Sequence, residues 1–169
     1  MIRQLLLLGI LTDGKMHGYR LNEYIKHAMG FYTDLKKSTA YYILDRMEKE
    51  GYVNCETERE GKRPERRVYE ITEPGKAYFH ELLRNCLAGY TPTSYGDDIC
   101  VAFIDKLPPA EIHTLLEGKR QKIVARLETF KERKEHRGGW KHVISHNIAH
   151  LKADLSWIDS ILKEVRKES

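Results

Sequence analysis

The sequence predicts a mainly α-helical protein of two domains, with one small β-hairpin in its first half. Apolar residues recur every three or four positions in several segments, which is typical of helices with one buried face. The spacing changes to alternation between residues 52 and 71, which indicates strands. A segment rich in glycine and small polar residues separates the two halves at 85–98. We therefore expect domains at 1–88 and 99–169, with a joint at 89–98.

The composition excludes several classes of protein. The chain has 169 residues, of which 41% are hydrophobic and 32% charged. No run approaches the roughly 18 apolar residues of a membrane-spanning helix, so we expect no membrane association. The apolar stretch at 5–11 is too short for a signal peptide. Three widely spaced cysteines argue against disulfides and zinc knuckles, so we expect a cytoplasmic protein.

The first domain begins with three predicted helices. The first covers Ile2–Leu11, with Leu5, Leu8 and Leu11 at helical spacing. The second covers 17–29 and ends at Gly30. The third runs from Lys36 or Lys37 to Glu50, and Gly51 ends it. Its apolar stripe at positions i, i+3, i+4 and i+7 consists of Ala40, Ile43, Leu44 and Met47.

A β-hairpin and a fourth helix follow. We predict strands at 52–58 and 67–71, because polar and apolar residues alternate there. Thr72 is expected to cap a helix that continues to about Leu87, and Pro74 suits its first turn.

The tip of the predicted hairpin is basic. Residues 59–67 contain five basic and two acidic side chains, a net charge of +3, whereas the whole chain carries only +4. By itself such a loop is more often a solvated turn than a phosphate contact.

Three helices followed by a hairpin form a winged helix-turn-helix, in which the third helix enters the major groove of DNA. The exposed face of the third helix and its start are basic and rich in hydroxyl groups. Together with the basic hairpin tip, this predicts that the protein binds double-stranded DNA. The candidate DNA-binding residues are Lys36, Lys37, Ser38, Thr39, Tyr41, Tyr42, Arg46, Lys62, Arg63 and Arg66.

The second domain is predicted to be an antiparallel helical dimerisation region. A short helix at 98–105 precedes a stop at Leu107-Pro108-Pro109, and longer helices follow at 109–136 and 140–166. The last helix has apolar residues spaced alternately by four and three, as in a coiled coil. This stripe either packs within its own chain or forms a homodimer, and we expect the homodimer. The candidate dimerisation residues are Ile144, Ile148, Leu151, Leu155, Ile158 and Leu162.

These segments together resemble the PadR family of bacterial transcriptional regulators, in its larger branch with a virulence-activator-like C-terminal domain. The similar stretches include LLLLGIL at 5–11, HGYRL at 17–21, STAYYIL at 38–44 and RVYEITEPG at 67–75. The resemblance implies a homodimeric DNA-binding regulator, most often a repressor. It also places Tyr41 where the family has a tyrosine that contacts phosphate. The chain departs from the family pattern at Lys36-Lys37 and at Tyr42, where sequence preference is expected to differ.

Two further groups of residues have more than one interpretation. His142, His146 and His150 are spaced by four, so they could hold a transition metal, act as a pH switch or form a polar helix flank. We favour the polar flank and expect no metal and no cofactor. Trp140 and Trp157 could line a pocket for a small-molecule effector or lie in a core or interface.

The function predicted is that of a homodimeric repressor that binds an operator. The alternative is a dimeric adaptor or effector-binding protein with the same fold and little affinity for DNA. We find no combination of residues that indicates an enzyme, such as paired carboxylates or a nucleophile beside a base.

Overall fold

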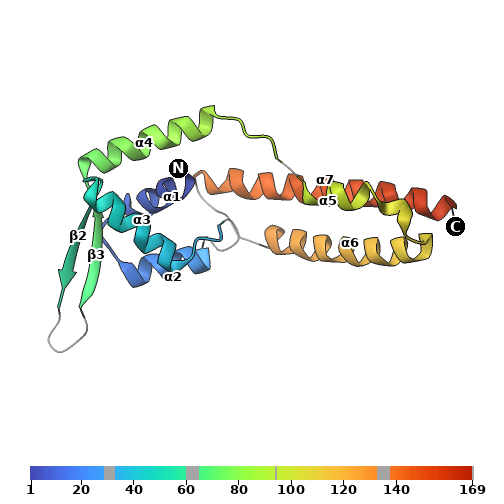
Figure 1. The fold of residues 1–169 in the computed structure, drawn as a ribbon, viewed down its shortest axis with the longest axis horizontal. Helices are drawn as coiled ribbons and strands as arrows, with labels where there is room; N and C mark the ends of the chain where they lie inside the picture. The colour runs from blue at the N-terminus through green and yellow to red at the C-terminus, as the bar shows by residue number, and fades with distance from the viewer. Residues whose placement is uncertain (29–32, 60–64, 94, 133–137, 169) are drawn as a thin grey trace. The chain divides into compact units, whose positions relative to one another are not determined.

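The computed structural model describes residues 1–28, 33–59, 65–93, 95–132 and 138–168 (Figure 1). These residues form two compact units, Met1–Pro92 and Thr93–Ser169. The described residues are mainly helical, with one small antiparallel sheet, so the predicted fold class is confirmed. None of the described helices is long and apolar enough to cross a membrane.

The first unit contains four helices and three strands. In chain order they are α1 (Ile2–Leu11), β1 (Met16–His17), α2 (Gly18–Ala28), α3 (Lys37–Lys49), β2 (Val53–Glu58), β3 (Arg66–Ile71) and α4 (Glu73–Ala88). The strands pair in the antiparallel order β1-β3-β2. β1 was not predicted, and His17 was expected in the second helix. Two residues cannot show an alternating pattern, and His17 is extended because it pairs with Val68 of β3.

Local signals at the ends of two helices act as predicted. Gly51 follows α3 with φ of +79°, a conformation that favours glycine. Thr72 Oγ1 accepts a hydrogen bond of 3.0 Å from the Gly75 backbone N–H and so caps α4. A Cβ atom on Gly75 would lie 2.0 Å from the Tyr52 carbonyl oxygen, so only glycine fits there. The predicted stop at Gly30 lies outside the described residues.

The core of the first unit lies between the helices and the sheet. Ala40, Leu44 and Met47 are buried as the predicted stripe of α3, whereas Ile43 is only half-buried at its edge. Tyr69 of β3 is fully buried, and its ring centroid lies 6.3 Å from that of Tyr41 in α3. The sheet and α3 therefore share one core, which fixes the position of the predicted recognition helix.

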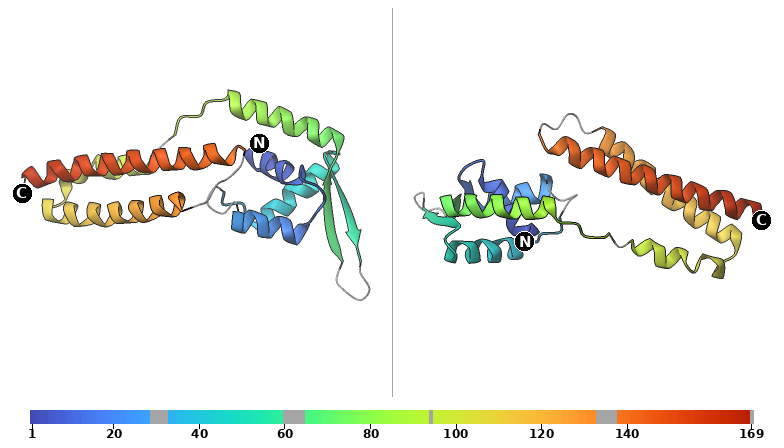
Figure 2. Two further views of the ribbon diagram at one scale, coloured as in Figure 1. Left: turned by 180° about the vertical axis from the view of Figure 1, so that it is seen from behind. Right: turned by 90° about the horizontal axis from the view of Figure 1, so that it is seen from above.

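The second unit is built on two long helices. It contains α5 (Gly96–Val101), a 3-10 turn at Ile104–Lys106, α6 (Pro109–Lys131) and α7 (Trp140–Glu168). The short helix predicted at 98–105 is thus two separate elements. The predicted end of α6 at 136 lies outside the described residues. Figure 2 shows α6 and α7 side by side and antiparallel. Arg120 of α6 and Asp159 of α7 form an ion pair of 2.7 Å.

The apolar stripe of α7 packs within its own chain over much of its length. Ile158, Leu162 and Val165 are buried against Ile112 and Leu116 of α6. Ile158 and Leu162, which were predicted as dimer contacts, are therefore covered by α6 of their own chain. Two antiparallel helices joined by a short connection bury their apolar faces on each other first. Leu151 is also buried, and Ile144, Ile148 and Leu155 are half-buried.

Candidate nucleic-acid interface

The start of α3 presents a basic surface to solvent. Leu35 is buried and anchors the segment, while Lys36, Lys37 and Ser38 after it are exposed. Lys36 is the N-cap residue, and no side chain of the described residues caps the first turn of the helix. The free backbone N–H groups of this turn and the lysine ammonium groups all favour an anion such as phosphate.

The outer face of α3 lies opposite its buried stripe. Tyr42 is 69% exposed on this face, so its ring is available for a partner. Arg46 is also exposed, but its Nε donates a hydrogen bond of 2.8 Å to Glu50. This hydrogen bond raises the pKa of Arg46. Thr39 is half-buried at the edge of the face. This face of α3 is therefore open to solvent at Tyr42 and Arg46.

Tyr41, which the family resemblance places at a phosphate contact, also packs against the core of the first unit. The ring is half-buried beside Tyr69, and the Lys37 ammonium lies 5.8 Å from its centroid. A Cβ atom on Gly18 would lie 2.7 Å from the Tyr41 hydroxyl oxygen. The hydroxyl thus sits at the start of α2, where the absence of a Gly18 side chain leaves room for it.

The hairpin is described only at its base. Lys62 and Arg63 lie outside the described residues. Arg66 begins β3 and is exposed, and its guanidinium carbon lies 5.7 Å from the ring centroid of Tyr19 in α2. Arg66 therefore points toward α2, where a cation–π contact holds it at modest energy.

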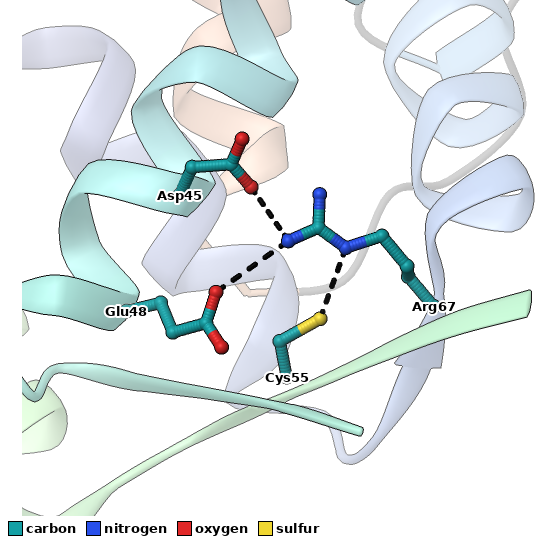
Figure 3. A network of polar contacts seen from close by, with 4 residues as sticks. All are labelled: Asp45, Glu48, Cys55 and Arg67. Atoms are coloured by element: carbon teal, nitrogen blue, oxygen red, sulfur yellow. Dashed lines mark hydrogen bonds and ion pairs between the residues drawn. The ribbon is translucent and has the colours of Figure 1, made fainter. Parts of the chain in front are cut away.

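Arg67 has a different role from the one its basic neighbours suggested (Figure 3). Its Nη2 lies 2.7 Å from Asp45 Oδ1 and 3.5 Å from Glu48 Oε2, both on α3. Its Nε donates a hydrogen bond of 3.2 Å to Cys55 Sγ on β2. The hydrogen bond to Cys55 is the main cause that raises the pKa of Arg67, while burial opposes it. We name this group, Arg67 with Asp45, Glu48 and Cys55, the arginine clamp.

The arginine clamp connects the base of the hairpin to α3. The side chains of Arg67, Asp45 and Glu48 remain 41%, 44% and 38% exposed, so solvent screens their attraction. The clamp matters more for the charge of α3. Arg67 offsets the negative charges of Asp45 and Glu48, which would otherwise repel a phosphate backbone. From the sequence, Arg67 was grouped with the free basic residues of the loop, because no local pattern indicates its partners on α3.

Of the three evenly spaced histidines of α7, two contact each other within the described residues. The Nε2 atoms of His146 and His150 lie 3.0 Å apart, whereas His142 has no side-chain contact with either within the described residues. No group of three or more potential metal ligands occurs among the residues that the structure describes. Trp157 is half-buried, with the Lys119 ammonium 5.6 Å from its ring centroid.

Comparison with known proteins gives consistent matches along the chain. The model of the transcriptional regulator PadR-like family matches residues 7–81, and that of the virulence activator alpha C-terminal domain matches 100–166. The negative transcriptional regulator PadR of Bacillus subtilis is 26% identical over an alignment of 179 positions, which covers 96% of each chain.

Solved structures show the same fold over nearly the whole chain. The crystal structure of Bacillus subtilis PadR in complex with operator DNA has a TM-score of 0.82 and 23% identity, and the match covers 98% of this chain and 99% of that one. The structure of the same protein with p-coumaric acid has a TM-score of 0.78 at 23% identity, with the same coverage.

Proposed function

The chain belongs to the PadR-like family of transcriptional regulators, and on this premise we propose that it is a homodimeric repressor that binds a specific operator. The observation that carries the proposal is the exposed, uncapped and basic start of α3. The name of the curated relative, a negative transcriptional regulator, supports repression. A chromosomal target implies a cytoplasmic location.

In the proposed complex, α3 enters the major groove and the hairpin follows the adjacent backbone. Ser38, Thr39 and Tyr42 face base edges, and Lys36, Lys37 and Tyr41 face phosphates. Glu50 and DNA compete for the guanidinium group of Arg46. Lys62, Arg63 and Arg66 of the hairpin contact the backbone or the minor groove. Residues 1–88 form the DNA-binding part in this proposal.

Residues 99–169 form the proposed dimerisation part. Large apolar side chains on α5, on α6 and in the segment between them are exposed in the single chain: Ile99 of α5 by 70%, Leu115 of α6 by 56% and Phe103 of the segment by 63%. Such side chains are typical of a surface that a partner covers. We propose that a second copy covers them, together with the half-buried Ile144, Ile148 and Leu155 of α7.

A small-molecule effector is part of the proposal. It is supported by the solved structure of a similar regulator with p-coumaric acid. That compound is the first to test, by adding it to the protein bound to DNA. Release of the DNA is the expected result.

The test of DNA binding is fluorescence anisotropy with the DNA upstream of the protein's own gene, over a series of salt concentrations. We expect tight binding that exceeds binding to random DNA and falls steeply with salt. The variant Lys36→Ala/Lys37→Ala is expected to lower affinity about 10-fold or more and to reduce the salt slope by about two.

The matched control is Lys122→Ala/Lys152→Ala, which removes two exposed lysines of α6 and α7. It is expected to leave both affinity and slope unchanged. Equal binding by the two double variants would contradict the assignment of α3 to DNA. Absence of DNA binding by the wild type at low salt would favour the adaptor function instead.

A further inference from the structure

Two histidines of α7 direct ring nitrogens at each other. His146 and His150 are one helical turn apart and exposed, and their ring centroids lie 4.4 Å apart at an interplanar angle of 70°. Their Nε2 atoms are 3.0 Å apart. At this separation two neutral imidazoles either share one proton in a hydrogen bond or bind one cation with both lone pairs.

The separation of the two nitrogens suits a metal ion. Imidazole nitrogens bind first-row metals at about 2.0–2.1 Å, so an ion held by both atoms at 3.0 Å would have an N–metal–N angle of about 90°. This angle is that of adjacent ligands in octahedral or square-planar geometry. It fits Ni²⁺ or Cu²⁺ better than tetrahedral Zn²⁺.

Carboxylates line the same hollow as His150. His150 borders a hollow of about 270 Å³, and carboxylates form part of its lining. Asp97 is paired with Lys119, whereas Asp98 and Asp154 have no ion pair within the described residues. The other lining residues are Tyr95, Ala153 and Trp157. Nearby carboxylates attract a divalent cation and raise its local concentration.

We propose that His146 and His150 bind one divalent ion of the Ni²⁺ or Cu²⁺ class through their Nε2 atoms, with water at the remaining positions. No third histidine, cysteine or carboxylate joins them in the part of the chain that the structure describes, so water supplies the other ligands. The site is independent of the proposed DNA-binding function.

His142 offers a matched control within the same helix. The spacing from His142 to His146 equals that from His146 to His150, so the sequence alone favours neither pair. In the structure only the second pair has a ring contact within the described residues. A substitution of His142 therefore removes one exposed histidine of α7 without touching the proposed site.

The experiment is isothermal titration of the full, untagged chain with Ni²⁺, because a histidine tag would bind the ion itself. We expect one ion per chain. His146→Gln and His150→Gln should each weaken binding about 10-fold or more, since the two ligands act together. His142→Gln should change affinity less than about twofold, because it lies outside the chelating pair. Far-UV circular dichroism of all four proteins is expected to be the same.

Three results would overturn the proposal. The first is that the wild type does not bind Ni²⁺ at 100-fold excess over about 1 μM protein. The second is that the His150→Gln variant binds Ni²⁺ as tightly as the wild type. The third is that all three variants lose the same affinity for Ni²⁺. The last result would mean that the histidines bind the ion singly and not as a pair. Mg²⁺, which prefers oxygen ligands, should give no histidine-dependent heat.

Discussion

The two units of the chain bury their helices in different ways. In the Met1–Pro92 unit, helices pack around a three-stranded sheet, and one cluster of fourteen buried residues is described. In the Thr93–Ser169 unit, α6 and α7 have mainly each other, and the described cluster contains five buried residues. The same helical spacing of apolar residues therefore yields a closed core in one unit and an open one in the other.

The difference separates the two proposed tasks. The first unit holds α3 and the hairpin in fixed positions through the shared core and the arginine clamp. The second unit leaves Ile99, Phe103 and Leu115 exposed, which supports the proposal that a second copy covers them. The following changes test this comparison.

The largest expected effect is in the closed unit. Gly75→Ala would place a Cβ atom 2.0 Å from the Tyr52 carbonyl oxygen, a clash with backbone that no side-chain rotation relieves. We expect a loss of about 3 kcal/mol or more in the free energy of unfolding. Urea denaturation followed by circular dichroism measures it. An unchanged midpoint would show that the junction of β2 and α4 is looser than described.

The open unit should lose its partner and keep its fold. Ile99→Asp/Phe103→Asp introduces charges at two exposed positions, so the helical content should stay the same. Analytical ultracentrifugation is expected to show monomers. Operator affinity should fall about 100-fold, because the two half-sites are no longer bound by one linked molecule. A stable dimer of this variant would place the interface elsewhere.

A smaller effect tests the arginine clamp. Asp45→Asn removes a negative charge from the recognition helix, and charge alone predicts tighter binding to DNA. If the clamp positions the hairpin, the variant instead binds operator about 3- to 10-fold more weakly. Anisotropy measures the difference. Glu58→Gln, an exposed residue of β2 outside the clamp, is the control and is expected to bind equally or more tightly.

The smallest effect is a gain in stability. Gly118 lies within α6, and a Cβ atom on it would meet nothing within 4 Å. Gly118→Ala should therefore stabilise the second unit by about 0.5–1 kcal/mol, because alanine favours the helix. Thermal unfolding of the full chain reports the change. A loss of stability would indicate that a second chain contacts Gly118.

Much of the first unit could be predicted because its signals are local. The helical stripe of Ala40, Leu44 and Met47, the cap at Thr72 and the stop at Gly51 depend on residues a few positions apart. The strand β1 could not be predicted, since it is extended only through its pairing with β3. The residues of the DNA face were named from the sequence, and their contacts with DNA remain predictions.

By itself, the sequence determined where the long helices and the strands β2 and β3 form and that α3 has a basic start, because backbone propensity and capping act over one or two turns. Only the tertiary structure decided which partners those elements meet. It assigned Arg67 to Asp45 and Glu48, and Ile158 and Leu162 to α6. It also paired His150 with His146. Contacts such as Arg67 with Asp45 join residues far apart in the chain, and their formation depends on how whole elements pack and not on any short stretch of residues.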